Sequence, residues 1–201
     1  MRSNLDLLSR AWDALGNQWL LAMAICVLNG ILTSVLSSVG FGLGSLLLGG
    51  ALAFGMSRVM VLIYRGHVPS VDTYFDGFRH FVPTLIASLL LAVLVLMGTV
   101  LLVIPGIVAA IGLSQTFYVL QDHPEMGAEA ALKESWRLTW TNGHMWKVLF
   151  MGFLSFFVLL GGALAFGVGL FIAYPLVSVM LAGLYEELRL NDSGVGRVEF
   201  M

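Results

Sequence analysis

Four histidines, which share the charged segments of the sequence with acidic residues, are the side chains best suited to metal binding or proton transfer. They are His67, His80, His123 and His144, and the nearest carboxylates belong to Asp72, Asp76, Asp122 and Glu125. Imidazole and carboxylate groups ligate metals or act as acids and bases where they converge. No two of these histidines have the i, i+4 spacing of a helical metal clamp. We therefore predict no metal site, no cofactor and no catalytic residue, and interpret the pattern as a hydrated protein margin.

The composition argues against further classes of function. Cys26 is the one cysteine, so neither a disulfide framework nor a thiolate zinc site is available. The formal net charge of −2 argues against a nucleic-acid partner. Of the 201 residues, 59% are hydrophobic and only 11% are charged, whereas soluble domains have about 25% charged residues. Such a surface needs a solvent other than water, and the sequence therefore predicts a lipid bilayer as its main partner.

Neutral polar side chains inside three uncharged stretches are the remaining candidates for a site. We select Asn29, Gln115 and Ser178 as the candidate polar lining of a permeation path or a lipid groove. The alternative is that they form hydrogen bonds between helices, each worth roughly 0.6 kcal/mol in membrane proteins. The stretches contain no Asp, Glu, Lys, Arg or His, which disfavours a proton-coupled pump and an intramembrane protease.

These stretches have the length of paired membrane spans. They are residues 14–57, 81–121 and 148–185, with 44, 41 and 38 residues. Because a helix needs about 20 apolar residues to cross a bilayer, each stretch has room for two spans. Glycine- and proline-rich segments near their midpoints provide the turns. The sequence thus predicts an all-α polytopic bundle of six transmembrane helices in three hairpins, near residues 19–38, 44–64, 82–102, 104–121, 147–165 and 167–186.

The charged residues give this predicted bundle a direction. Six spans place the N-terminus, two loops and the C-terminus on one side, where the Lys and Arg residues gather. The positive-inside rule makes that side cytoplasmic, so both termini are expected in the cytoplasm. A short amphipathic interfacial helix is expected before each hairpin, because apolar side chains recur there at helical spacing. The expected apolar faces are Leu5, Leu8, Trp12 and Leu15; Val71, Tyr74, Phe75 and Phe78; and Leu132, Trp136 and Trp140.

The three hairpins have the character of one repeated unit within a single membrane domain, residues 1–201. The pseudo-repeats cover about 1–66, 67–122 and 123–190, and a short tail covers 191–201. Leu8–Trp12 and Leu132–Trp136 are similar segments at the start of the first and third repeats. Internal repeats are frequent in transporters, but they also arise by duplication of a stable hairpin.

A series of short motifs occupies the second half of the chain. They are Ile104–Ile107, Tyr118–Glu125, Ala131–Trp136, Gly143–Lys147, Gly167–Gly169, Tyr174–Leu176 and Leu184–Leu188. Over roughly Tyr74 to Leu188 the chain resembles a bacterial family of integral membrane proteins known as domain of unknown function 975. It is similar, more distantly, to the membrane region beside some glycerophosphodiester phosphodiesterases. The resemblance implies a multi-pass protein of the bacterial cytoplasmic (inner) membrane, and it implies no catalytic residue.

Several motif positions have an expected structural role. Asp122 is expected to cap a helix that begins near Pro124. Pro175 is expected to kink the last span and to free a carbonyl that needs another partner. The positions assigned to structure are Pro105, Gly106, Asp122, Pro124, Trp136, Gly143, Pro175 and Tyr185.

Three functions fit this sequence. The first is a non-enzymatic protein that moves or shelters a small or amphipathic solute or a lipid, in a groove lined by Asn29, Gln115 or Ser178. The second is a membrane scaffold or regulatory partner, which associates with another membrane protein or with its own copies. The third is an enzyme that acts on lipid headgroups, for which His80, His123 and His144 would have to converge in one pocket.

Overall fold

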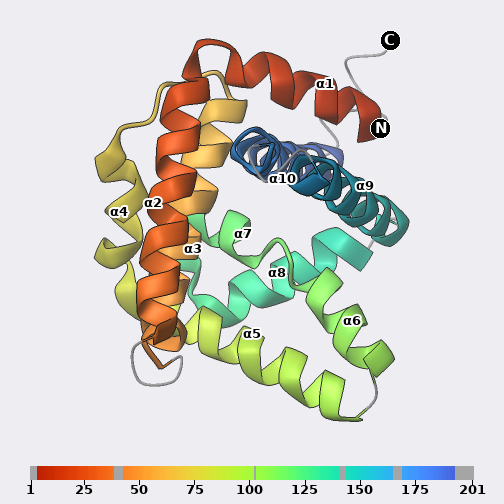
Figure 1. Cartoon of the computed structure of the whole chain (residues 1–201). Coiled ribbons are helices and arrows are strands. Elements are labelled where there is room, and N and C mark those ends of the chain that lie inside the picture. The colour runs from red at the N-terminus through yellow and green to blue at the C-terminus, as the bar shows by residue number, and fades with distance from the viewer. Residues whose placement is uncertain (1–3, 39–42, 102, 141–143, 165–168, 193–201) are drawn as a thin grey trace. The chain divides into compact units, whose positions relative to one another are not determined.

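A computed structural model describes residues 4–38, 43–101, 103–140, 144–164 and 169–192, and these residues are almost entirely helical (Figure 1). The α-helices are α1 Asn4–Leu15, α2 Trp19–Ser38, α3 Leu43–Tyr64, α4 Val71–Arg79, α5 Phe81–Leu101, α6 Val103–Gly112, α7 Thr116–Asp122, α8 Ala128–Trp140, α9 Met145–Leu164 and α10 Leu170–Asp192. Two 3₁₀ turns, η1 Gly16–Gln18 and η3 Pro124–Met126, lie between them. No strand occurs among the described residues, and the predicted all-α class is confirmed.

Within the described residues, five helices are long and apolar enough to cross a bilayer. They are α2, α3, α5, α9 and α10, and each coincides with a predicted span. The expected span at 104–121 is instead divided into α6, with 10 residues, and α7, with 7. Ten helical residues extend only about 15 Å, roughly half of the hydrocarbon core. Five helices therefore support the prediction that the chain is a membrane protein.

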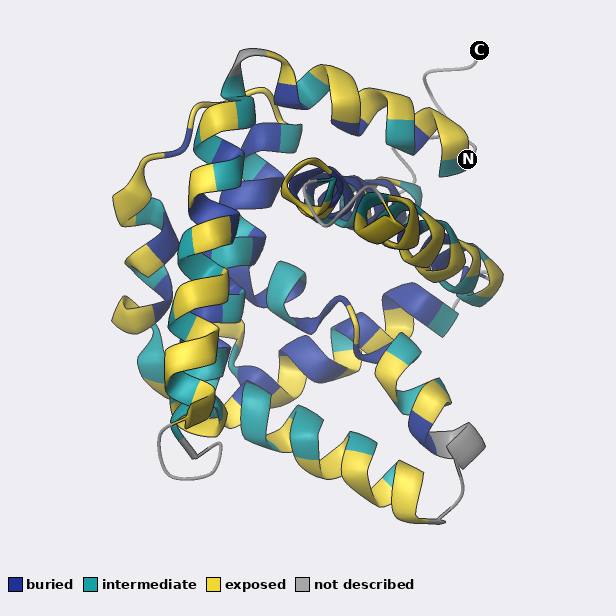
Figure 2. Cartoon of the chain, viewed as in Figure 1, coloured by how far each residue is buried: buried dark blue, intermediate teal, exposed yellow. Residues whose placement is uncertain are grey.

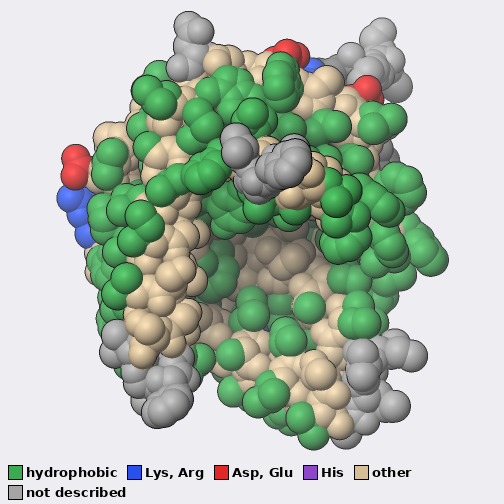
Figure 3. Space-filling view, in the orientation of Figure 1, with side chains coloured by type: hydrophobic (Ala, Val, Ile, Leu, Met, Phe, Trp, Pro, Cys, Tyr) green, Lys and Arg blue, Asp and Glu red, His purple; other side chains and the backbone are tan. Residues whose placement is uncertain are grey.

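The five long helices differ in how much of their surface the protein covers. Only 11% of the span is buried in α5 and in α9, and 17% in α2, compared with 56% in α3 and 50% in α10. Exposed residues run along α5 and α9 in Figure 2, and hydrophobic side chains dominate the face shown in Figure 3. Apolar surface of this extent is unstable in water, so lipid is the solvent that fits it.

The helices pack as two units. Unit 1 contains residues 1–27, 60–69 and 146–201, and unit 2 contains residues 28–59 and 70–145. α2 and α3 each supply residues to both units, because the division falls within these helices. The division differs from the three predicted sequence repeats, and the single domain stays a prediction.

Unit 1 is held together at one end by ion pairs on the last helix. Lys147 Nζ, near the start of α9, lies 2.5 Å from Glu187 Oε1 near the end of α10, and both side chains are almost fully buried. Arg65, just after α3, donates from Nε to Glu186 Oε1 at 2.8 Å. Asn4 of α1 donates to the Lys147 carbonyl at 3.4 Å. Four helices therefore meet where the charged residues gather.

The other end of α9 and α10 is closed by small residues. A methyl group added at Gly162 of α9 would lie 2.8 Å from the Ala173 side chain of α10. With the Lys147–Glu187 pair at the opposite end, this contact shows that α9 and α10 run antiparallel. Glycine and alanine let their backbones approach closely, as is usual between membrane helices.

In unit 2, α3 and α4 approach each other closely at two glycines. A side chain at Gly55 would overlap the Tyr74 carbonyl, and one at Gly77 would overlap the Ala51 carbonyl. These two contacts, in reversed order along the chain, show that α4 lies antiparallel against α3. Arg58 Nε lies 3.5 Å from Asp76 Oδ2 beside this contact. Glycine is required at both positions because any Cβ would displace a neighbouring backbone.

The expected apolar faces of the short helices are only partly correct. In α1, the residues packed inside the protein are Leu7, Ala11 and Leu15, whereas Leu5 and Trp12 are exposed. Helix α1 packs on α10. Its apolar residues therefore form two stripes, one that contacts the protein and one that is exposed to a less polar exterior.

Helices α4 and α8 show the same separation. Tyr74 is buried in α4 while Val71, Phe75 and Phe78 are exposed. In α8, Leu132 is buried but Trp136 is exposed and stacks on Trp140, with ring centroids 5.4 Å apart. The charged residues of α8 form ion pairs along its outer surface, Lys133 with Glu129 and Arg137 with Glu134. An outer surface that carries both exposed apolar side chains and charged side chains is typical of helices in the headgroup region.

Candidate binding groove

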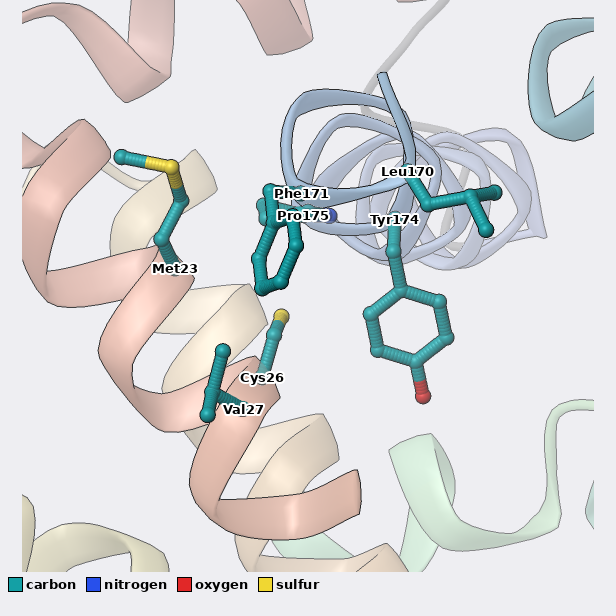
Figure 4. Close-up of a pocket in the computed structure, with 7 residues that line it drawn as sticks. All are labelled: Met23, Cys26, Val27, Leu170, Phe171, Tyr174 and Pro175. Atoms are coloured by element: carbon teal, nitrogen blue, oxygen red, sulfur yellow. The ribbon is translucent and has the colours of Figure 1, made fainter. Parts of the chain in front are cut away.

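A groove in unit 1 has the clearest form of a binding site among the described residues. It has a volume of about 260 Å³ and lies between α2 and α10 (Figure 4). Its lining side chains are Met23, Cys26 and Val27 of α2, and Leu170, Phe171, Tyr174 and Pro175 of α10. Apart from the Cys26 thiol and the Tyr174 hydroxyl, they are hydrocarbon or thioether groups, so the groove is an apolar one.

The α2 wall follows from helical spacing. Met23, Cys26 and Val27 have the i, i+3, i+4 relation that places side chains on one face of a helix. Ala22 and Ile25 lie on the buried side of α2 and fix its position in unit 1. A small thiol and a β-branched valine next to a flexible methionine leave space on this face.

The α10 wall is built around a proline. Phe171, Tyr174 and Pro175 repeat at the same helical spacing, and Pro175 lies inside the helix. Proline has no N–H, so Pro175 cannot donate the usual i→i−4 bond to the Phe171 carbonyl. Ser178, three residues after Pro175, donates from Oγ to the Tyr174 carbonyl at 2.8 Å. The helix is thus continuous but lacks one backbone donor beside the groove.

The size and lining of the groove limit what it can hold. An apolar cavity of about 150 Å³ already accommodates a molecule the size of benzene, and this groove is larger. Among the described residues, no carboxylate, imidazole or amine lines it, so an ion would lose its hydration without compensation. A segment of hydrocarbon chain is the ligand class that the lining matches.

None of the three predicted polar lining residues belongs to this groove. Asn29 lies on α2 in unit 2, where its Oδ1 accepts a hydrogen bond from Tyr74 Oη at 2.8 Å. Ser178 is bonded to its own helix. The alternative interpretation, hydrogen bonding between helices, applies to Asn29 because the bond joins α2 to α4.

Gln115 lies in a second polar setting, the break between α6 and α7. Its backbone N–H donates to Ser135 Oγ of α8 at 3.2 Å, and Ser135 Oγ donates to the Gly112 carbonyl at 2.9 Å. Its side-chain Nε2 donates to Ser114 Oγ at 3.1 Å. Gln115 is 2% exposed, and its Oε1 accepts no bond from the described residues. The residue therefore fastens the break to α8 and lines no open path there.

The expected cap at Asp122 is wrong. Asp122 is the last residue of α7, and its Oδ1 accepts from Gln121 Nε2 at 2.6 Å. Pro124 does occupy the first turn of a helix, but that helix is the short η3, whose N-cap is His123 without a side-chain bond. The prediction failed because α7 extends to Asp122, so that His123, and not Asp122, holds the N-cap position of η3.

The other structural positions have varied surroundings. A side chain at Gly106 would overlap Thr99 of α5, so glycine at this position allows α6 to approach α5 closely. Tyr185 is buried in α10, and Trp136 packs on Trp140. Gly143 and the side chain of Pro105 lie outside what the structure describes.

The histidines that were considered for lipid chemistry have separate local partners. His80 stacks on Phe54, with ring centroids 5.5 Å apart. His144 Nδ1 lies 3.1 Å from the Leu138 carbonyl, and His123 Nδ1 lies 3.4 Å from Glu125 Oε1. Across the described residues, no three His, Cys, Asp or Glu side chains are placed to share a metal ion.

Sequence reasoning missed the groove, although one part of its signal was visible. Pro175 and its missing hydrogen bond were expected, and they mark the α10 wall. The α2 wall carries no comparable signal, because Met23, Cys26 and Val27 are ordinary residues of an apolar helix. Only their position opposite α10 gives them a role.

Comparison with known proteins identifies no relative of this chain. No protein-family model matches the chain, and neither a curated protein nor a solved structure matches it.

Proposed function

We propose that this protein is a non-enzymatic, multi-pass protein of the bacterial cytoplasmic membrane that shelters or moves a lipid-like molecule. The hydrocarbon chain of that molecule lies in the groove between α2 and α10. The observation that carries the proposal is the lining of the groove, seven side chains with no ionised group in a volume of about 260 Å³.

The membrane placement follows from the long apolar helices and from the charge pattern. Six spans in three hairpins, with both termini cytoplasmic, keep the Lys and Arg residues on one side. In this arrangement α6 and α7 together form the fourth span, interrupted at Gln115.

Photo-cross-linking within cells tests the proposal. A benzophenone amino acid replaces Phe171, which lines the groove, and in a second protein it replaces Phe157 of α9. Both positions are exposed to a similar extent, 55% and 62%. Lipids attached after irradiation are then identified by mass spectrometry.

We expect the position 171 probe to capture one lipid class in excess of its share of the membrane, because a groove selects its ligand. The position 157 probe serves as the control and should capture lipids in proportion to their abundance. Identical lipid profiles at the two positions would show that the groove is ordinary lipid-facing surface.

A further inference from the structure

Two polar atoms at the break between α6 and α7 have no hydrogen-bond partner among the described residues. They are Gln115 Oε1 and Trp140 Nε1, and both atoms are buried. Buried polar atoms are nearly always hydrogen-bonded, and an ordered water supplies the bond where the protein does not. Because lipid offers no hydrogen bonds, the surrounding membrane cannot supply it either. The break therefore needs a partner that the described part of the chain does not provide.

The unpartnered atom of Gln115 is an acceptor. The oxygen and nitrogen of a side-chain amide are distinguished by their neighbours, and here the neighbour is Ser114. Its hydroxyl hydrogen is donated to the Ile111 carbonyl at 2.8 Å, so Ser114 Oγ acts as the acceptor towards the amide. The amide atom 3.1 Å from Ser114 Oγ is accordingly the donor Nε2. Gln115 Oε1 is left as an oxygen that can accept.

The unpartnered atom of Trp140 is a donor at the same turn of the chain. An indole N–H donates and cannot accept. Trp140 Nε1 lies 2.9 Å from the position that a Cβ would take at Gly112. Ser135 Oγ binds both ends of this turn, the Gly112 carbonyl at 2.9 Å and the Gln115 N–H at 3.2 Å. One turn, residues 112–115, thus carries an acceptor and has a donor against it.

Both side chains are held in place by other contacts. The Gln115 amide donates to Ser114 Oγ, and the Trp140 ring stacks on Trp136 with ring centroids 5.4 Å apart. The charged side chains of α8 that form ion pairs do so with one another, so the break shows no need for an ion. The partner that fits is an uncharged group that donates one hydrogen bond and accepts another. A hydroxyl group does both.

We propose that the break between α6 and α7 binds one hydroxyl group, from a water molecule or a small alcohol, which donates to Gln115 Oε1 and accepts from the Trp140 indole N–H. Ser114 is exposed beside Gln115 and marks the side from which a small molecule reaches the turn. The site belongs to unit 2 and takes a polar group. It does not depend on the function proposed for the apolar groove in unit 1.

NMR of the full chain in bicelles of diacyl phosphatidylcholine tests this site. The five tryptophan rings are isotope-labelled, and the indole signal of Trp140 is identified with Trp140→Phe. We expect a cross-peak between the Trp140 N–H and water, which should disappear in Gln115→Met because the acceptor is lost. Gln121→Met is the matched control. It removes another buried glutamine amide, which bonds Asp122, and it should retain the cross-peak.

A second series with ethylene glycol distinguishes the two sources of the hydroxyl group. A water cross-peak that persists in glycol assigns the site to water, and its replacement by a cross-peak to the glycol methylene protons assigns it to an alcohol. Either result supports the proposal. No cross-peak from the wild-type Trp140 N–H to water or to glycol overturns it, as does a cross-peak of equal strength in Gln115→Met.

Two further measurements guard against a folding defect in the variant. Trp12 and Trp19 lie edge to face with ring centroids 4.9 Å apart, so their unchanged indole signals show that unit 1 has folded. The contact is also tested without any substitution, through the side-chain amide protons of Gln115 in the wild type. We expect these protons to show a cross-peak to the same molecule. A cross-peak at Trp140 with none at Gln115 would show that no hydroxyl group joins them.

Discussion

The α9–α10 pair and the α5–α7 segment come from equivalent stretches of sequence but form different structures. Each stretch has about 40 residues without charge, and each is predicted as a hairpin of two spans. The last stretch forms two continuous helices of 20 and 23 residues. The middle one forms a helix of 21 residues and then two fragments of 10 and 7. Hydropathy is therefore not what decides whether a span is continuous.

The hydroxyl groups explain the difference. In the continuous helices, Ser155 and Ser178 donate to carbonyls of their own helix, four residues earlier. At the break, Ser135 of α8 bonds both the Gly112 carbonyl and the Gln115 N–H. These two groups would otherwise take part in the helical ladder. A side chain from another helix thus competes with the backbone and ends α6.

The first prediction concerns the ion pair that closes the continuous pair of helices. Lys147→Met leaves the buried Glu187 carboxylate without its closest cation, and we expect unfolding free energy in detergent to fall by about 3–5 kcal/mol. The double variant Lys147→Met with Glu187→Leu should recover most of this loss. A single variant as stable as the wild type would show that the pair does not hold α9 to α10.

Lys133→Met is the matched control. Lys133 pairs with Glu129 at the surface of α8, and exposed pairs contribute only about 0–1 kcal/mol. If both lysine variants lose equal stability, burial is not the source of the effect.

The second prediction concerns the glycine at the break. A Cβ at Gly112 would lie 2.5 Å from the Trp136 ring, so Gly112→Ala should cost about 1–3 kcal/mol as overpacking, measured by unfolding in detergent. Gly161→Ala on α9 is the control, because no other described residue comes within 4 Å of its added carbon. The control should be neutral or slightly stabilising, since alanine favours a helix. Equal loss in both would mean that Trp136 does not pack there.

The third prediction separates the two kinds of hydroxyl. Ser135→Ala leaves the Gly112 carbonyl and the Gln115 N–H without this partner, which should cost about 1–3 kcal/mol. Amide exchange at Gln115, followed by mass spectrometry, should become faster. Ser178→Ala should change stability by less than about 0.5 kcal/mol. Unchanged exchange at Gln115 in Ser135→Ala would contradict our explanation of the break.

The smallest effect is electrostatic and lies on α8. A hydrogen bond from Lys133 and its positive charge lower the pKa of Glu129 below its usual value. The pair therefore adds stability above the unfolded pKa, and this contribution is lost as pH falls through the folded pKa. NMR titration should show the Glu129 pKa rising towards its usual value in Lys133→Gln. No change would mean that the two side chains are not paired in solution.

These contrasts show which features of the structure could be predicted from the sequence. The boundaries of α2, α3, α5 and α9 were predictable within two residues, because length, absence of charge and glycine breaks are local signals, whereas α10 continues six residues beyond its predicted end. The break at Gln115 was not, although Ser114, Gln115 and Thr116 were visible as polar residues. Its cause is Ser135, 20 residues away in the chain, and such a contact has no signature in a single sequence.

The groove has the same limitation. Pro175 was recognised as a helix distortion, but its partner face on α2 consists of common apolar residues. The polar residues that were chosen as lining, Asn29 and Gln115, proved to hold helices together. Polarity in an apolar segment therefore indicated packing here, while the candidate site is formed by residues that match the lipid.

Retention of lipid by the purified protein tests the central claim most directly. The wild type, Val27→Phe, which fills the groove, and Val35→Phe, an exposed position of α2 outside it, are washed in mild detergent and weighed intact by native mass spectrometry. We predict that the wild type and Val35→Phe each retain one lipid per chain and that Val27→Phe retains none. Equal retention by all three proteins would contradict a binding groove between α2 and α10.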